Sequence, residues 1–307
     1  MATTVATTAG MAAAAVATKS GGVDADPLSL PIGLQLYTVG DDLKKDLDGT
    51  LQTIAAIGYR EVETAGLPGS YSAQQMRAAL DKAGLKCRST HFPLPLLQMD
   101  VAGHVAQAQQ LGAEYLICAA PWVADMSRFK PPAAGQGMET SFMALMDTFT
   151  AEDWRWNAEQ FNKIGAEVKK AGLQFGYHNH GAEFREFDGK IAFDELLRNT
   201  DPELVAMEMD CGWVANAGHD PIDYLKRFPR RFHLLHVKDL KKGYTANTGF
   251  DIHGTEIGHG VLDWPRIFKA AKSSGVRGYF VEQEPPYARP PLEEIKISFD
   301  YLHQLKI

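Results

Sequence analysis

The feature that most constrains the fold of this chain is an alternation of short apolar runs and longer segments with helical spacing, repeated eight times after residue 30. Each short run predicts a strand, and each longer segment places apolar residues three or four positions apart, which predicts a helix buried along one face. The first such helix carries Leu43, Leu47, Leu51, Ile54 and Ile57. The predicted strands are 32–37, 61–65, 86–91, 115–119, 173–178, 204–210, 232–237 and 278–282.

Glycines stand just before five of these strands, where helices commonly end in a left-handed residue. Eight strand–helix units in about 275 residues indicate a closed barrel rather than an open sheet. No glycine-rich phosphate loop follows any strand, which excludes the usual nucleotide-binding folds. We therefore predict an α/β fold, a single (β/α)8 TIM barrel over residues 31–307. The five glycines are Gly58, Gly84, Gly112, Gly172 and Gly275.

Charge, hydropathy and cysteine content limit the kinds of partner and bonding that we expect for this chain. The chain has 38 acidic and 31 basic residues, for a net charge of -7, and no dense basic run. We therefore expect no nucleic-acid partner. No stretch of 18 apolar residues occurs, so we expect no membrane span. Cys87, Cys118 and Cys211 are odd in number, widely spaced and flanked by apolar residues, which favours buried free thiols over a disulfide or a metal site.

Residues 1–30 differ in composition from the rest of the chain. Up to Gly22 they are almost entirely Ala, Thr, Val and Gly, with one charge at Lys19. One interpretation is the remnant of an export signal, of the twin-arginine type, without its basic head; it predicts a periplasmic or otherwise exported protein. The other is a disordered tail, which leaves the protein in the cytoplasm.

Imidazole and carboxylate side chains gather at the ends of the predicted strands, where barrel enzymes carry their chemistry. His178 and His180 share one face of their strand, and His236 and Lys238 share one face of theirs. Imidazole and carboxylate together are ligands of Mn, Zn, Fe and Co. A single strand-end histidine is more often structural, and Asp210 alone could cap a turn, but their joint placement favours a metal site. The strand-end residues are His91, His178, His180, Asp210, His236, Lys238, Asp239, Glu282 and Glu284.

Four segments carry a family resemblance. They read EMDCGWVANAG at 208–218, HVKD at 236–239, IGHGVLDW at 257–264 and FVEQEP at 280–285. These segments resemble the xylose isomerase-like barrel superfamily of sugar isomerases and epimerases. That group also contains inosose dehydratases, ketose 3-epimerases and 3-keto-glycoside lyases. The resemblance covers roughly residues 31–305.

The resemblance implies one divalent metal, with Mn the expected ion and Zn, Co, Fe and Mg as alternatives. Asp210, His236 and Glu282 match ligand positions. Relatives commonly read Glu-Asn-His at the fifth strand, where this chain reads His-Asn-His from residue 178. We therefore expect His178 as the fourth ligand, with Glu183 as a base or an alternative ligand.

This departure bears on the mechanism that the resemblance implies. Epimerases of the group use two metal-bound carboxylates on opposite faces of the substrate, and one of them is a histidine here. A single-base route through an enediolate is therefore favoured, with Glu282, Glu183 or His180 as the base. Lys238 or His91 would stabilise the oxyanion or protonate a leaving group. Loss of a β-oxygen then defines a dehydratase or 3-keto-glycoside lyase, and return of the proton defines an isomerase.

Substrate contacts and loops complete the expectations. We expect a small-molecule carbohydrate as substrate. Two long loops, 121–149 and 241–260, predict lids over the mouth, and the methionine-rich first loop equally predicts a contact in a homo-oligomer. The rival functions are an abasic-site endonuclease, disfavoured by the acidic balance, and a non-catalytic sugar-binding barrel. The residues expected to contact the sugar are Tyr37, Glu63, His91, Trp213, which replaces a histidine of the relatives with a flat wall, and His259.

Overall fold

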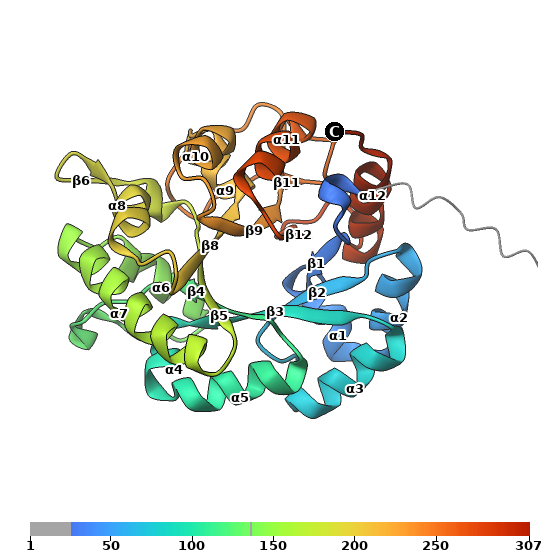
Figure 1. The fold of residues 1–307 in the computed structure, drawn as a ribbon, viewed down its shortest axis with the longest axis horizontal. Coiled ribbons are helices and arrows are strands. Elements are labelled where there is room, and N and C mark those ends of the chain that lie inside the picture. Colours follow the sequence, from blue (N-terminus) through green and yellow to red (C-terminus); the bar gives the residue numbers. More distant parts are fainter. Residues whose placement is uncertain (1–25, 136) are drawn as a thin grey trace, which may run out of the picture.

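The computed structural model describes residues 26–135 and 137–307. Within them, parallel strands close into the predicted barrel, in the order β1-β12-β9-β8-β5-β4-β3-β2. Strands lie at the centre of Figure 1 and helices form a ring around them. The strands are β1 (Gly33–Gln35), β2 (Glu61–Ala65), β3 (Lys86–Pro93), β4 (Tyr115–Ala120), β5 (Gln174–His178), β8 (Val205–Asp210), β9 (Phe232–Val237) and β12 (Gly278–Val281).

The helices follow the strands in the alternation that the sequence predicts. They are α1 (Gly40–Lys45), α2 (Leu47–Ile57), α3 (Ala73–Ala83), α4 (Leu94–Met99), α5 (Val101–Leu111), α6 (Met138–Met146), α7 (Ala151–Lys170), α8 (Ala192–Asn199), α9 (Cys211–Asn216), α10 (Pro221–Arg227), α11 (Trp264–Ser274) and α12 (Pro291–Gln304).

Short elements decorate the loops. Four are 3-10 turns, η1 (Pro27–Ser29), η2 (Leu36–Val39), η3 (Met126–Arg128) and η4 (Ala182–Phe184). Two antiparallel ribbons pair β6 (Glu186–Phe187) with β7 (Lys190–Ile191), and β10 (Asp239–Leu240) with β11 (Gly254–Thr255).

Local signals explain where the helices stop and start. Gly84, Gly112 and Gly275 end their helices with φ of 74°, 78° and 86°, a left-handed conformation that a side chain disfavours. The start of α3 carries a capping box, in which Ser72 and Gln75 satisfy each other's backbone N–H groups. Three of the five predicted glycines thus end their helices in the left-handed conformation. Gly58 also ends its helix, at φ 132°, and Gly172 lies one residue beyond Ala171, which caps the end of α7.

Two helices, α6 and α9, are not among the elements that the sequence predicted. Helix α6 occupies part of the long 121–149 loop. Helix α9 begins directly after β8, because the Asp210 carboxylate accepts a hydrogen bond from the backbone N–H of Trp213 and caps the first turn. Asp210 therefore has both expected roles: it ends strand β8 and it caps the helix that follows.

The interior agrees with the composition. Cys87, Cys118 and Cys211 are free and buried, as predicted. Burial raises the pKa of the Cys87 and Cys118 thiols to about 12, so they are inert at neutral pH. None of the described helices has the length and apolar character needed to cross a bilayer.

The first 25 residues lie outside the described part of the chain, and with them most of the predicted signal remnant or tail. An exported location and a homo-oligomer stay predictions.

Strand register places the polar strand ends beside one another. His178 of β5 is the register partner of Glu208 in β8, and Asp210 is the partner of His236 in β9. Because the carboxyl ends of parallel strands meet at one end of the barrel, these side chains converge there.

Candidate active site

The four predicted metal ligands come together at this end. His178, Asp210, His236 and Glu282 are buried, and one nitrogen or carboxylate oxygen of each lies within 4.8 Å of the others. They come from β5, β8, β9 and the residue directly after β12. Two imidazoles and two carboxylates at this spacing are a donor set that fits a divalent transition metal.

Asp210 is held by hydrogen bonds of both its backbone and its side chain. Its backbone N–H donates to Oδ1 of Asn179, at 3.1 Å, which ties β8 to the loop after β5. Its Oδ1 accepts from the N–H of Trp213 at 2.8 Å. The second oxygen, Oδ2, lies 3.0 Å from Nζ of Lys238 and stays available to a ligand.

His236 is held through both ring nitrogens. Nδ1 lies 2.8 Å from Oε2 of Glu282, on the side of the predicted metal set. Nε2 lies 2.6 Å from Oε1 of Glu63 and 3.3 Å from Oε2 of Glu208. A metal-binding histidine commonly donates its second N–H to a carboxylate, and Glu63 and Glu208 stand where such a partner belongs.

A second layer of polar side chains lies against this set. Nε2 of His91 is 2.8 Å from Oε1 of Glu63 and 2.7 Å from Oε2 of Glu208. Burial opposes a charge on His91, but the two carboxylates outweigh it and raise its pKa to about 9. One oxygen each of Glu63 and Glu208 is buried without a hydrogen-bond partner in the described structure, so both carboxylates retain capacity to hold a cation or a proton. His91, His178, Glu208 and His236 form a second set with ligand atoms within 4.8 Å.

Glu208 is absent from the predicted strand-end residues, and Glu284 is among them without an assigned role. Glu208 is a charged residue inside an otherwise apolar strand, two positions before Asp210 and hence on the same face. That pattern is a usable signal for an inward-facing carboxylate. Glu284 follows β12 in a loop, where alternation gives no direction.

Lys238 is buried among carboxylates. Its Nζ lies 3.0 Å from Oδ2 of Asp210 and 2.9 Å from Oε2 of Glu282, and it contacts Glu284 directly. Burial alone would lower its pKa, but these carboxylates outweigh burial and hold the pKa well above its ordinary value. The Lys238 side chain therefore stays positively charged inside the site.

A cavity of about 720 Å³ opens over the site. Its lining includes His91, His178, His180, Glu282 and Glu284. A second cavity of about 700 Å³ lies beside it, between the loops that follow β1, β2 and β12.

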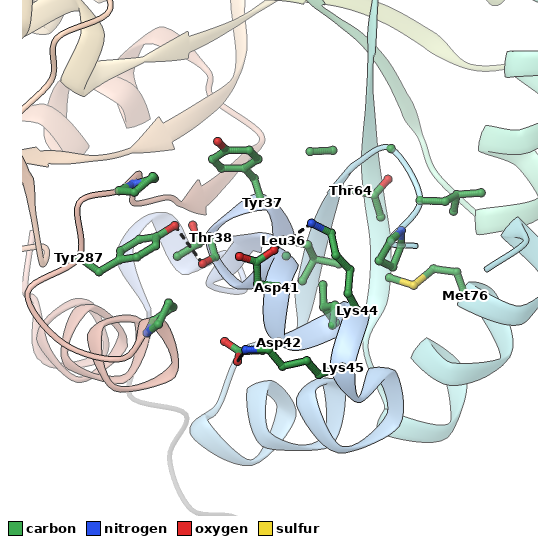
Figure 2. A pocket seen from close by; sticks show the side chains of 18 residues that line it. Leu36, Tyr37, Thr38, Asp41, Asp42, Lys44, Lys45, Thr64, Met76 and Tyr287 are labelled. Carbon is green, nitrogen blue, oxygen red and sulfur yellow. Dashed lines mark hydrogen bonds and ion pairs between the residues drawn. The ribbon is translucent and has the colours of Figure 1, made fainter. Parts of the chain in front are cut away.

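Figure 2 shows this second cavity, with Asp41 and Lys44 paired at 2.9 Å between Tyr287 and Met76. Tyr37 lines both cavities, so the two adjoin.

His180 faces the first cavity from the loop after β5. Its ring packs 5.8 Å from the rings of both Trp213 and Phe250. Burial, and then the charge of Lys238, lower its pKa to about 3. The imidazole is therefore neutral at physiological pH and has a free lone pair.

Glu183, predicted as a base or an alternative ligand, lies behind His180. Its Oε1 accepts from the Tyr177 hydroxyl at 2.6 Å and from the backbone N–H of His180 at 3.0 Å. Burial raises the pKa of this carboxyl. Glu183 belongs to neither ligand set and does not line either cavity, so its contacts position the His180 loop.

Of the residues predicted to contact a sugar, some line the first cavity and others are buried behind its wall. Tyr37 and His91 line the first cavity. Glu63 and Trp213 are buried, at 0% and 1% exposure, and do not line it. The Trp213 indole lies under His180 and Phe250, and its N–H faces Glu284 at 3.3 Å. The structure therefore places the predicted flat wall one layer behind the surface.

His259 lies apart from these residues. Its ring is half exposed, 3.6 Å from Glu256, and lines neither cavity.

The two predicted lid loops meet over the mouth. Phe142 of α6 and Phe250 of the 241–260 loop lie 5.8 Å apart, edge to face, and both line the first cavity. The Trp122 ring stacks on Phe142, with the two ring centroids 6.1 Å apart. Phe142 and Phe250 therefore form an aromatic part of the cavity wall, contributed by the two loops.

Fold and site together define a (β/α)8 barrel with a polar, metal-compatible cluster at the carboxyl ends of its strands. The profile of the xylose isomerase-like TIM barrel family matches residues 51–305, and the chain belongs to this family.

Individual relatives are sugar-processing enzymes. The chain is 30% identical to an inosose dehydratase of Clostridium perfringens over 166 residues, which cover 50% of this chain and 55% of that enzyme. It is 30% identical over 186 residues to an inosose dehydratase of Mesomycoplasma hyopneumoniae, covering 55% of this chain and 60% of that enzyme. The chain thus spans little more than half the length of the curated relatives that it matches.

A solved structure matches over more of the chain. The structure of a sugar phosphate isomerase/epimerase from Parabacteroides distasonis superposes with a TM-score of 0.71 at 26% identity. The superposition covers 89% of this chain and 93% of that one.

Proposed function

We propose that this protein is a divalent-metal-dependent lyase or dehydratase that acts on a keto-sugar or a 3-keto-glycoside. The observation that carries the proposal is the convergence of four ligand atoms, from His178, Asp210, His236 and Glu282, within 4.8 Å of one another. Two of these residues, His178 and Glu282, line the 720 Å³ cavity. These residues would hold the ion, with Mn the expected one. A bound divalent ion polarises a ketone and stabilises negative charge on its oxygen.

The proton transfer falls to the chain's own side chains. His180 lines the cavity and is the proposed base: its imidazole would accept the proton from the carbon next to the ketone, which leaves an enediolate. Glu183 holds the backbone N–H of His180 and so fixes the loop that carries the base. The C–O bond at the next carbon would then break, and the proton taken by His180 would pass to the leaving oxygen. The product is water in a dehydration, or the free aglycone when that oxygen is glycosidic.

The character of the cavity favours an uncharged sugar. Among the described residues that line the 720 Å³ cavity, none is lysine or arginine, whereas phosphate sites rely on such donors. The lining therefore supports an uncharged substrate, such as the inosose in the name of the dehydratases, rather than a sugar phosphate.

Isomerisation of a ketose is the second candidate. It follows if His180 returns its proton to the neighbouring carbon instead, and the name of the Parabacteroides distasonis neighbour supports it.

The test is incubation of the purified, Mn²⁺-loaded protein with a panel of ketoses and 3-keto-glucosides. Enone absorbance reports elimination, and sugar NMR reports epimers or isomers. D210A is expected to lose bound metal and turnover together. D81A, an exposed aspartate on α3, is the matched control and keeps both. Metal binding without turnover of any member would favour a non-catalytic sugar-binding barrel.

A further inference from the structure

Lys238 lies between the same carboxylates that make up half of the predicted ligand set. Its ammonium is 3.0 Å from Asp210 and 2.9 Å from Glu282. The side chain is 1% exposed, so water contributes little to its solvation. In the absence of a metal ion, this ammonium neutralises the two carboxylates.

An ammonium and a divalent cation compete for these two side chains. Both are attracted by the same oxygens, and they repel each other strongly in a buried site. Binding an ion between Asp210 and Glu282 therefore requires the Lys238 ammonium to withdraw from them.

The stem of Lys238 has little freedom to turn away. A Cβ added at Gly212 would lie 2.8 Å from its Cγ, so the backbone of α9 packs tightly against it. The Trp213 ring lies 5.3 Å from the ammonium and covers another side. Only the tip of the side chain is left to move.

Glu284 is the acceptor within reach of that tip. It already contacts the Lys238 ammonium, and its Oε1 is fixed by the Trp213 indole N–H at 3.3 Å. Glu284 also lines the cavity, on its wall. An ammonium that leaves Asp210 and Glu282 can therefore remain paired on Glu284.

We propose that Lys238 is a built-in counter-cation of the metal-free site, and that Glu284 is the positioning residue that holds its ammonium once a divalent ion binds. This inference rests on the metal site of the proposed function. It makes the metal affinity of the protein depend on the Lys238–Glu284 pair, although neither residue is a predicted ligand.

The test is a double-mutant cycle read out by Mn²⁺ affinity, with the free ion measured by EPR. K238M removes the competitor, so we expect Mn²⁺ to bind about tenfold more tightly. E284Q removes the acceptor, so we expect Mn²⁺ to bind about 10- to 100-fold more weakly. In the K238M background, the loss caused by E284Q is expected to shrink to less than about a third, because there is no ammonium to hold.

Thermal unfolding without metal supplies a second readout. K238M leaves buried carboxylates unpaired, so its Tm is expected to fall without metal and to recover with Mn²⁺. If K238M does not fold, K238Q keeps polar contacts without the charge and carries the same predictions. K44M, an exposed lysine paired with Asp41, is the matched control and leaves Mn²⁺ affinity unchanged.

The outcomes separate this inference from the function it rests on. A wild-type protein that binds none of Mn²⁺, Zn²⁺ and Co²⁺ contradicts the metal site and this inference with it. A wild-type protein that binds Mn²⁺ while K238M binds it no more tightly overturns this inference alone. An E284Q loss of equal size in both backgrounds also overturns it.

Discussion

Nε2 of His236 lies 2.6 Å from Oε1 of Glu63, a carboxylate on a strand that does not pair with β9. The contact crosses the barrel interior and leaves Nδ1 of the imidazole facing Glu282, at 2.8 Å, on the side of the ligand set. The Glu63 carboxylate is itself held by Nε2 of Gln35 at 2.8 Å. Glu63 therefore fixes which nitrogen of His236 is available to a metal.

Replacing Glu63 tests this relationship. We expect E63Q to weaken Mn²⁺ binding by about 10- to 100-fold, because the imidazole loses its charged partner while the ligands remain. Isothermal titration with Mn²⁺ measures the change. E61Q, on the same strand but paired with Arg88, is the matched control. Equal affinity in E63Q and wild type would show that His236 needs no such partner.

Replacing His180 tests the proposed base. We expect H180Q to lower kcat by about 100- to 10,000-fold, with metal content unchanged because His180 is in neither ligand set. Steady-state kinetics and elemental analysis of the same preparation measure both. H104Q changes a histidine that lines the same cavity and is expected to keep kcat. Loss of metal in H180Q would instead make His180 a ligand.

The contact between Phe142 and Phe250 predicts a coupling between two loops. Phe142 and Phe250 meet edge to face at 5.8 Å, a geometry worth about 0.5–1.5 kcal/mol beyond buried area. We expect F142A and F250A to show a coupling free energy of that size in urea unfolding. Strictly additive effects would mean that the loops do not close on each other.

Burial of His233 predicts a pH dependence of stability away from the site. Burial, and then the charges of Arg277 and Arg231, lower its pKa from an ordinary value of 6.5 to about 4. The unfolded chain therefore takes up a proton below pH 6.5 that the folded chain refuses until about pH 4. The stability due to the neutral ring is fully present above pH 6.5 and is lost as pH falls toward 4.

The variant H233F removes this titration. We expect its free energy of unfolding to decline less than that of the wild type between pH 7 and pH 4, a window set by the lowered pKa of His233. Urea unfolding at four pH values across the window measures both proteins. Parallel curves for the two would assign the acid loss to other groups.

Much of the barrel could be predicted because the signals that mark its strands and helix ends are local in the sequence. The apolar runs and the glycines at helix ends, such as Gly84 and Gly275, are properties of short windows. Helix α9 was not predicted because Asp210, which caps it, was interpreted mainly as a metal ligand at the end of a strand. Helix α6 was not predicted because prolines and glycines, which favour a loop, lie directly before it at 131–137.

The site residues at the ends of strands could be predicted from the sequence, whereas the contacts between side chains inside the barrel could not. His178, Asp210 and His236 end their strands or lie one residue before the end, so the fold alone brings them together. Contacts such as Glu63 with His236 depend on which side chains meet across the barrel, which strand periodicity does not specify. The buried position of Trp213 likewise follows from the packing of His180 and Phe250 over it.

The central claim is that His178, Asp210, His236 and Glu282 hold a divalent ion that activity requires. Its most direct test is elemental analysis of the purified protein before and after chelation, with turnover measured on the same samples. We expect about one divalent ion per chain, its loss together with turnover on chelation, recovery of both with Mn²⁺, and neither in D210A. A protein that contains no divalent metal and turns over equally with and without chelator would show that activity does not depend on an ion held by these four residues.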